Sequence, residues 1–168
     1  MTEAGLVNAL CEERPATLDG ALVVSEAQTW IGTPYRHRAS LRGAGADCLG
    51  VIRGVWRALI GPEPEDLPPY ARSWAEDGAG EPMLDAALRW LVRQEAGPIE
   101  PGDVLLFRVA RGGPAKHAGI ATGARMMVHA YDGHAVTETP IPEAWERRIV
   151  GRFRFPAAET ACVLRDAR

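Results

Sequence analysis

A glycine-rich loop followed by an amphipathic helix is the feature that most constrains this chain. Gly43 to Ala46 lead into Asp47-Cys48, and from Cys48 onward apolar residues recur at helical spacing, which predicts a helix with one buried side. Asp47 is a favourable N-cap, because its carboxylate can accept from backbone N–H groups in the first turn. Cys48 then lies at the first helical position, where the helix dipole is expected to lower the thiol pKa toward neutrality. The alternative is a small apolar residue at the start of a core helix.

The composition predicts one globular domain. The chain has 168 residues, of which 46% are hydrophobic and 24% charged, so it can bury a substantial core. A formal net charge of -3 gives no electrostatic case for binding nucleic acid. The three cysteines, Cys11, Cys48 and Cys162, show no spacing typical of zinc sites and cannot form a disulfide scaffold.

Helical patterns precede strand patterns along the chain. We expect a lead-in segment over 1–20, a domain over 21–155 and a C-terminal tail over 156–168. Within the domain, the patterns predict helices at 21–31, 48–60 and 83–94, and strands at 104–108, 117–122, 126–131, 134–138 and 149–155. A tight hairpin turn is expected at Asp132-Gly133. Helices followed by an antiparallel sheet indicate the α+β class.

The loop over 61–80 is rich in proline and is expected to be ordered or to form a surface excursion. It carries Tyr70 and Trp74 among the prolines. Exposed aromatic residues are typical of interfaces, so the loop is a candidate docking surface. The alternative is a loop that only covers one edge of the core.

A thiolate that attacks a carbonyl needs a base, and histidine is the usual one near neutral pH. The chain has four histidines, His37, His117, His129 and His134. If the connection between their strands has an odd number of residues, His117 and His129 become diagonal neighbours on one face, roughly 7–8 Å apart at the backbone. A two-residue connection would place them on opposite faces. Either histidine could instead be a satisfied structural residue.

Five short fragments follow one another in an order typical of a known family. They are Gly32-Thr33-Pro34-Tyr35, Asp47-Cys48-Leu49-Gly50, Pro101-Gly102-Asp103-Val104, His117-Ala118-Gly119-Ile120 and Val128-His129-Ala130. With these fragments the chain resembles, over about residues 21–155, the NlpC-type, papain-like cysteine peptidases that cut bacterial cell-wall peptides. The run from Asp47 to Arg57 resembles more narrowly the branch that accompanies phage and gene-transfer-agent tails.

The resemblance assigns roles residue by residue. Cys48 corresponds to the nucleophile, His117 to the base, and His129 to the residue that orients the base. Tyr35 matches a tyrosine beside the nucleophile that helps to hold substrate or the oxyanion, and Asp47 matches an aspartate that can hold the substrate's free amine. One residue departs from the family, because Leu49 stands where serine is usual, so peptide-stem specificity does not carry over intact.

Basic residues gather just before the nucleophile. Arg36, His37, Arg38 and Arg42 could receive substrate carboxylates, or they could form a solvated loop. We name Arg36 and Arg38 as candidate substrate-binding residues.

The resemblance implies a papain-like NlpC-type fold, in which the nucleophile helix packs on an antiparallel sheet. It implies a peptidoglycan endopeptidase without metal or cofactor, acting on the bond between D-glutamate and the diamino acid of stem peptides. The alternatives are a structural tail-tip component with little turnover, and an amidase or acyltransferase with the same Cys-His-His set.

The first residues show neither a signal peptide nor a transmembrane span. We therefore expect synthesis in the cytoplasm and delivery to the periplasmic cell wall in a phage-like particle. Tail-tip or hub proteins would be the partners, and no nucleic acid or membrane is expected to bind.

Overall fold

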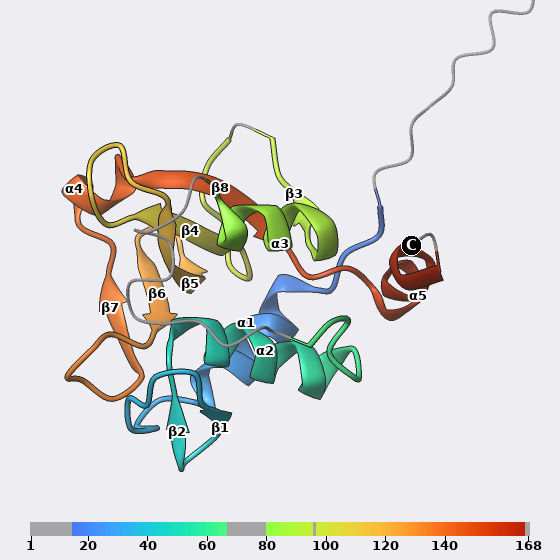
Figure 1. Cartoon of the computed structure of the whole chain (residues 1–168), viewed down its shortest axis with the longest axis horizontal. Coiled ribbons are helices and arrows are strands. Elements are labelled where there is room, and N and C mark those ends of the chain that lie inside the picture. Colours follow the sequence, from blue (N-terminus) through green and yellow to red (C-terminus); the bar gives the residue numbers. More distant parts are fainter. Residues whose placement is uncertain (1–14, 67–79, 96, 167–168) are drawn as a thin grey trace, which may run out of the picture.

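The computed structural model describes residues 15–66, 80–95 and 97–166, and these form an α+β domain (Figure 1). The helices are α1 (Gly20–Gln28), α2 (Cys48–Leu59), α3 (Pro82–Trp90), α4 (Glu143–Glu146) and α5 (Ala158–Asp166). The strands are β1 (Ser40–Leu41), β2 (Gly45–Ala46), β3 (Val92–Arg93), β4 (Val104–Arg108), β5 (Ala115–Gly123), β6 (Met126–His129), β7 (Thr137–Pro140) and β8 (Ile149–Arg154). The α+β prediction is confirmed.

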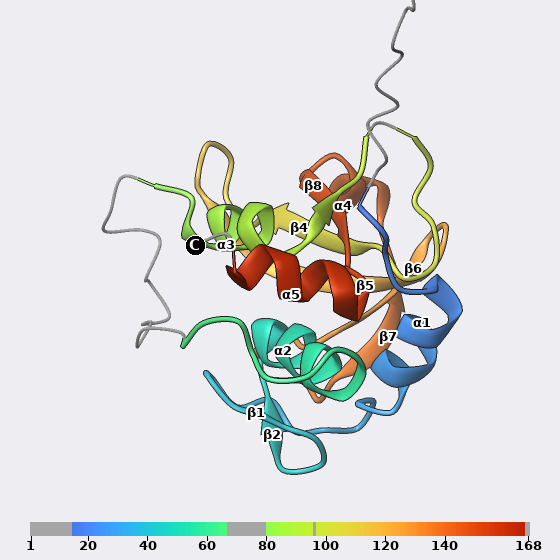
Figure 2. The same cartoon turned by 90° about the vertical axis from the view of Figure 1, so that its right-hand side faces the viewer.

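Six strands form one antiparallel sheet in the order β3-β8-β4-β5-β6-β7, while β1 and β2 form a small separate hairpin. Helices α1 and α2 lie side by side and both contact β5, the strand that carries His117 (Figure 1). Helix α5 lies beside α3 (Figure 2). The sheet therefore receives the nucleophile helix on the strand that carries the expected base.

Alternation along β4 and β5 divides the apolar side chains between the two faces of the sheet. The main core lies between the sheet and the helices, and it takes Leu106 and Ile120 from the strands. A smaller cluster on the other face contains Leu105, Phe107 and Met127. Successive side chains of a strand point to opposite faces, so both faces of β4 are buried. His117 pairs with Phe107 across the β4–β5 ladder, which places it on the face of the smaller cluster.

Helices α1 and α2 approach closely because α2 has a glycine at the contact. A Cβ atom at Gly54 would lie 1.9 Å from Cζ2 of Trp30, and the ring of Trp30 is buried against it. A glycine also permits the turn before β4. Gly102 has a φ of 88°, and a Cβ atom at this position would collide with the backbone of Gly20. These contacts fix α1 and α2 relative to the sheet.

Several expected boundaries were wrong. The third helix ends at Trp90 rather than Gln94, because Val92–Arg93 become an edge strand that pairs with β8. The segment expected as a tail contains α5, whose Ala161 is buried in the main core. His134 was expected in a strand after a tight hairpin, but it lies in a longer connection, and β7 begins at Thr137.

Most of the lead-in segment and of the loop over 61–80, including Tyr70 and Trp74, lies outside the described residues. The described start of that loop is tied to α2, because Glu63 accepts from Arg53 Nε at 2.6 Å and also pairs with Arg57. Within the described parts of the chain, no helix has the length and apolar character needed to span a membrane.

Candidate active site

Asp47 fixes the start of α2 and thereby the position of Cys48. Its Oδ1 accepts from the Gly50 N–H at 2.8 Å, and its Oδ2 accepts from the Arg38 N–H at 2.7 Å. The His37 ring also approaches the carboxylate, with Nδ1 3.7 Å from Oδ2. The predicted N-cap is confirmed, and Asp47 as a whole is 3% exposed. The expected role of Asp47 in holding a substrate amine stays a prediction.

The thiol of Cys48 lies in an environment that opposes its ionisation. Burial and the neighbouring Asp47 carboxylate raise the pKa of the Cys48 thiol to about 12, although backbone N–H groups of Ala118, Leu49 and Cys48 favour the thiolate. The expectation that the helix N-terminus would lower this pKa toward neutrality was therefore wrong, because burial outweighs the dipole. In the resting site the sulfur keeps its proton, and a base must remove it during the reaction.

The two histidines reach one face of the sheet through a bulge. The turn between β5 and β6 has two residues, Ala124 and Arg125, which alone would separate the two side chains. The register, however, shifts between Ala121 and Gly123, so Ile120 pairs with Val128. The extra residue restores the odd count that the prediction required.

The pairing of β5 with β6 extends from Ile120 to Gly123 in the described strands. Earlier in β5, the Ala118 N–H donates a hydrogen bond to the sulfur of Cys48, the first residue of α2. This contact places the start of α2 beside the strand that carries His117.

His117 and His129 are hydrogen-bonded to each other, with His117 Nε2 and His129 Nδ1 separated by 2.9 Å. Both rings are buried, at 5% and 7% exposure. Burial, with a smaller contribution from His129, lowers the pKa of His117 to about 3, and burial also lowers the pKa of His129. Both rings are therefore neutral at neutral pH. Because Nε2 of His117 is engaged, Nδ1 is the nitrogen that can take the thiol proton.

Three aromatic rings enclose the histidine pair. The ring of Trp145, from α4, stands edge-on to His117 with centroids 5.3 Å apart, and Phe107 and Tyr131 lie at 5.9 and 5.8 Å. These rings exclude water from the imidazoles and so account for the burial that lowers their pKa values. Sequence reasoning missed Trp145, because α4 is four residues long and carries no pattern that relates it to the histidines.

Cys48 and His117 open onto one cleft of about 290 Å³. Tyr35 lines the same cleft, in keeping with the place beside the nucleophile that the resemblance implied for it. Lys116 and Asp132, which were not expected here, add a cation and an anion to its walls. The cleft can therefore hold a polar, charged peptide next to the thiol.

The basic residues before Cys48 lie apart from the described lining of this cleft. The side chain of Arg36 runs over Gly45, whose Cβ position would lie 2.4 Å from Arg36 Cδ. Arg38 has a φ of 66° and donates its N–H to Asp47. Both side chains are exposed, and their role in binding carboxylates stays a prediction. His134 is also exposed and lies near the carbonyl of Asp132.

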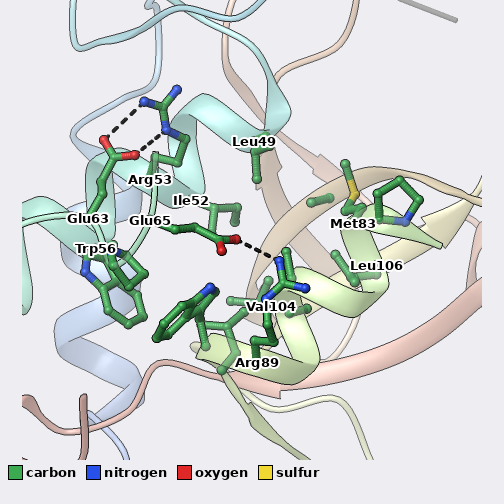
Figure 3. A pocket seen from close by; sticks show the side chains of 17 residues that line it. Leu49, Ile52, Arg53, Trp56, Glu63, Glu65, Met83, Arg89, Val104 and Leu106 are labelled. Carbon is green, nitrogen blue, oxygen red and sulfur yellow. Dashed lines mark hydrogen bonds and ion pairs between the residues drawn. The ribbon is translucent and has the colours of Figure 1, made fainter. Parts of the chain in front are cut away.

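Leu49 lines a different hollow from Cys48. Its side chain points into an apolar groove of about 190 Å³ between α2 and α3, which Ile52, Met83 and Leu106 also line (Figure 3). Two ion pairs, Arg53–Glu63 and Arg89–Glu65, border the groove (Figure 3). The replacement of the usual serine by Leu49 therefore changes this groove rather than the described wall of the cleft.

A thiol, a buried imidazole and a second imidazole that orients the first are the groups needed for nucleophilic attack on a carbonyl. The comparisons with known proteins agree with this chemistry. The NlpC/P60 family matches residues 32–154. The Gamma-DL-glutamyl hydrolase of Bacillus subtilis is 31% identical over 144 residues, which are 84% of this chain, and the chain spans 30% of the length of that protein.

Solved structures show the same fold. The NlpC/p60 domain of the peptidoglycan hydrolase SagA superposes with a TM-score of 0.54 and 22% identity, covering 82% of this chain and 100% of that domain. A lipoprotein-like NLP/P60 protein of Staphylococcus aureus gives a TM-score of 0.57 and 21% identity, covering 88% of this chain and 45% of that protein. This fold, the family match and the cysteine–histidine site agree with one another: the chain belongs to the NlpC/P60 family.

Proposed function

We propose that this chain is a cysteine peptidase that hydrolyses stem peptides of bacterial peptidoglycan at the bond between D-glutamate and the diamino acid. The observation that carries the proposal is that His117, which lines one cleft together with Cys48, is hydrogen-bonded to His129. Two proteins that resemble the chain support the substrate class, one named a gamma-DL-glutamyl hydrolase and the other a peptidoglycan hydrolase.

The proposed reaction assigns a function to each residue of the site. His117 takes the proton of Cys48 at Nδ1 while the sulfur attacks the substrate carbonyl. His117 then gives the proton to the leaving amine, and water hydrolyses the thioester. His129 holds the His117 ring in place through the hydrogen bond between His129 Nδ1 and His117 Nε2. The Cys48 N–H and Tyr35 stabilise the oxyanion.

The resting neutral pair sets the energetic demand on the first step. Burial raises the pKa of Cys48 and lowers the pKa of His117, so the neutral pair is favoured over the thiolate–imidazolium pair in the resting site. We therefore expect proton transfer to accompany attack on bound substrate rather than to precede it.

Digestion of purified peptidoglycan tests the proposal. Mass spectrometry of the soluble products should find new N-termini on the diamino acid with the wild-type chain and none with Cys48→Ala. If the products instead arise by cleavage of the amide bond between sugar and peptide, the amidase alternative would be favoured. Equal products from both chains would refute a thiol mechanism, and no products from either would favour the structural role.

We also propose that the chain acts after delivery by a phage-like particle, with tail-tip or hub proteins as partners. The run from Asp47 to Arg57, which resembles the tail-associated branch, supports this proposal. Mass spectrometry of purified particles should detect the chain, and particles that carry Cys48→Ala should enter cells poorly. Absence of the chain from particles would refute delivery, and normal entry with Cys48→Ala would favour a structural role.

A further inference from the structure

A third polar side chain extends the series of side-chain hydrogen bonds that begins at His117 and passes through His129. The far nitrogen of His129, Nε2, lies 2.9 Å from the hydroxyl oxygen of Thr139. We propose that Thr139 is a positioning residue, which accepts a hydrogen bond from His129 and thereby fixes the proton arrangement in which His117 can act as the base. This inference deepens the proposed function and rests on its assignment of Cys48 and His117.

The line of hydrogen bonds has two possible proton arrangements. In one, the Thr139 hydroxyl accepts from His129 Nε2–H, His129 Nδ1 accepts from His117 Nε2–H, and His117 Nδ1 is left with a lone pair. In the other, Thr139 donates to His129 Nε2, His129 Nδ1–H donates to His117 Nε2, and His117 Nδ1 carries the proton. Only the first arrangement lets His117 take the proton of Cys48. The hydroxyl must therefore accept in the reactive site.

Because both imidazoles are buried, their proton arrangement depends on fixed hydrogen-bond partners. Both imidazoles are almost completely buried, so bulk water is a poor substitute for a fixed partner at either ring. Burial lowers the pKa of both rings, so each carries one proton at neutral pH, and its position decides which nitrogens donate. When His117 receives the thiol proton at Nδ1, its Nε2–H still points at His129 Nδ1, and no other proton has to move.

The sheet holds Thr139 in place. His129 pairs with Thr137 and Met127 pairs with Thr139, so Thr139 is the diagonal neighbour of His129 on the same face. The strand continues into a backbone hydrogen bond of 2.8 Å from the Ile141 N–H to the Arg125 carbonyl. Thr139 does not belong to the described lining of the cleft, so it can act only through His129.

Thr137 supplies a matched control. It lies on the same strand, directly opposite His129, and it is half-buried like Thr139. Among the hydrogen bonds of the described residues, however, the His129 ring is joined to Thr139 and not to Thr137. Thr139→Val removes the hydroxyl at nearly constant volume, Thr139→Ser keeps it, and Thr137→Val repeats the loss at the control position.

Nuclear magnetic resonance of the imidazole nitrogens gives a readout that needs no substrate. In a Cys48→Ala background at neutral pH, long-range proton–nitrogen correlation should find His129 protonated at Nε2 and His117 with an unprotonated Nδ1. Thr139→Val should convert part or all of His129 to the form protonated at Nδ1, while Thr139→Ser and Thr137→Val should leave it unchanged. A parent in which His129 is protonated at Nδ1, or a Thr139→Val spectrum unchanged at both rings, would overturn the proposal.

Kinetics on peptidoglycan fragments with Cys48 intact give the second readout. General acid–base catalysis is worth roughly 10²–10⁴-fold, so Thr139→Val should lower kcat by about 10-fold or more with KM unchanged. Thr139→Ser should recover most of the loss. Equal losses in Thr139→Val and Thr137→Val would overturn the proposal, because they would indicate a change in the strand. If the wild-type chain cleaves no peptidoglycan, the proposed function fails, and the tautomer measurement alone decides the role of Thr139.

Discussion

The burial of His117 predicts a specific loss of stability in acid. Its pKa falls from the ordinary 6.5 to about 3 in the folded protein, with burial as the main cause. The unfolded chain therefore binds a proton at this residue at pH values where the folded protein does not. Stability must fall as the pH drops below about 6.5, and this loss is complete only below about pH 3.

The size of the effect follows from the shift. A difference of about 3.5 units corresponds to about 5 kcal/mol, because each unit is worth about 1.36 kcal/mol. Between pH 7 and pH 4 the part of this loss that appears is about 3 kcal/mol. Single domains have stabilities of roughly 5–15 kcal/mol, so the loss is large enough to measure.

Urea unfolding at pH 7 and pH 4 measures the effect when wild type is compared with His117→Gln. Glutamine does not titrate in this range, whereas the carboxylates contribute equally to both proteins. Wild type should lose about 3 kcal/mol more than His117→Gln between the two pH values. His134→Gln, which replaces an exposed histidine, is the control for the substitution itself. Equal losses in wild type and His117→Gln would refute the burial argument.

Three further predictions concern other residues. His129→Asn should keep part of the turnover, whereas His129→Ala should lower kcat by about 100-fold or more, because only asparagine can still orient the imidazole of His117; equal rates would contradict the orienting role. Gly54→Ala should destabilise the fold by about 1–3 kcal/mol in urea unfolding, because its Cβ would lie 1.9 Å from Trp30, and an unchanged midpoint would refute this packing. His134→Ala should leave kcat/KM unchanged, since this side chain is exposed, and a large loss would show that it contributes to the site.

The parts of the site that depend on local sequence were predictable. The Asp47 cap and the start of α2 at Cys48 follow from residues that are adjacent in the chain, and the structure confirms both. Strand parity left it open whether His117 and His129 share a face, because only an odd connection predicted it. The turn has two residues, and the shared face is reached instead by a bulge near Thr122. A bulge changes the count without leaving a clear sequence signal, so its position could not be predicted.

The parts that depend on burial and long-range packing were not predictable. The pKa of Cys48 is set by how deeply the sulfur is buried and by the distance to the Asp47 carboxylate, and neither is visible in the sequence. Trp145 reaches the histidines from α4, and Thr139 reaches them from β7, whose start was expected at His134. Such contacts join segments whose relative placement is decided by the whole sheet.

Trapping of the acyl-enzyme tests the central claim, that Cys48 attacks the substrate carbonyl, most directly. A synthetic stem peptide with a slow leaving group can be mixed with excess enzyme, quenched in acid within the first turnover and analysed by intact-protein mass spectrometry. The account predicts a mass increase equal to the acyl part of the peptide, located on Cys48 by peptide mapping and absent from Cys48→Ala. Product formation without any adduct, together with undiminished turnover by Cys48→Ala, would contradict it.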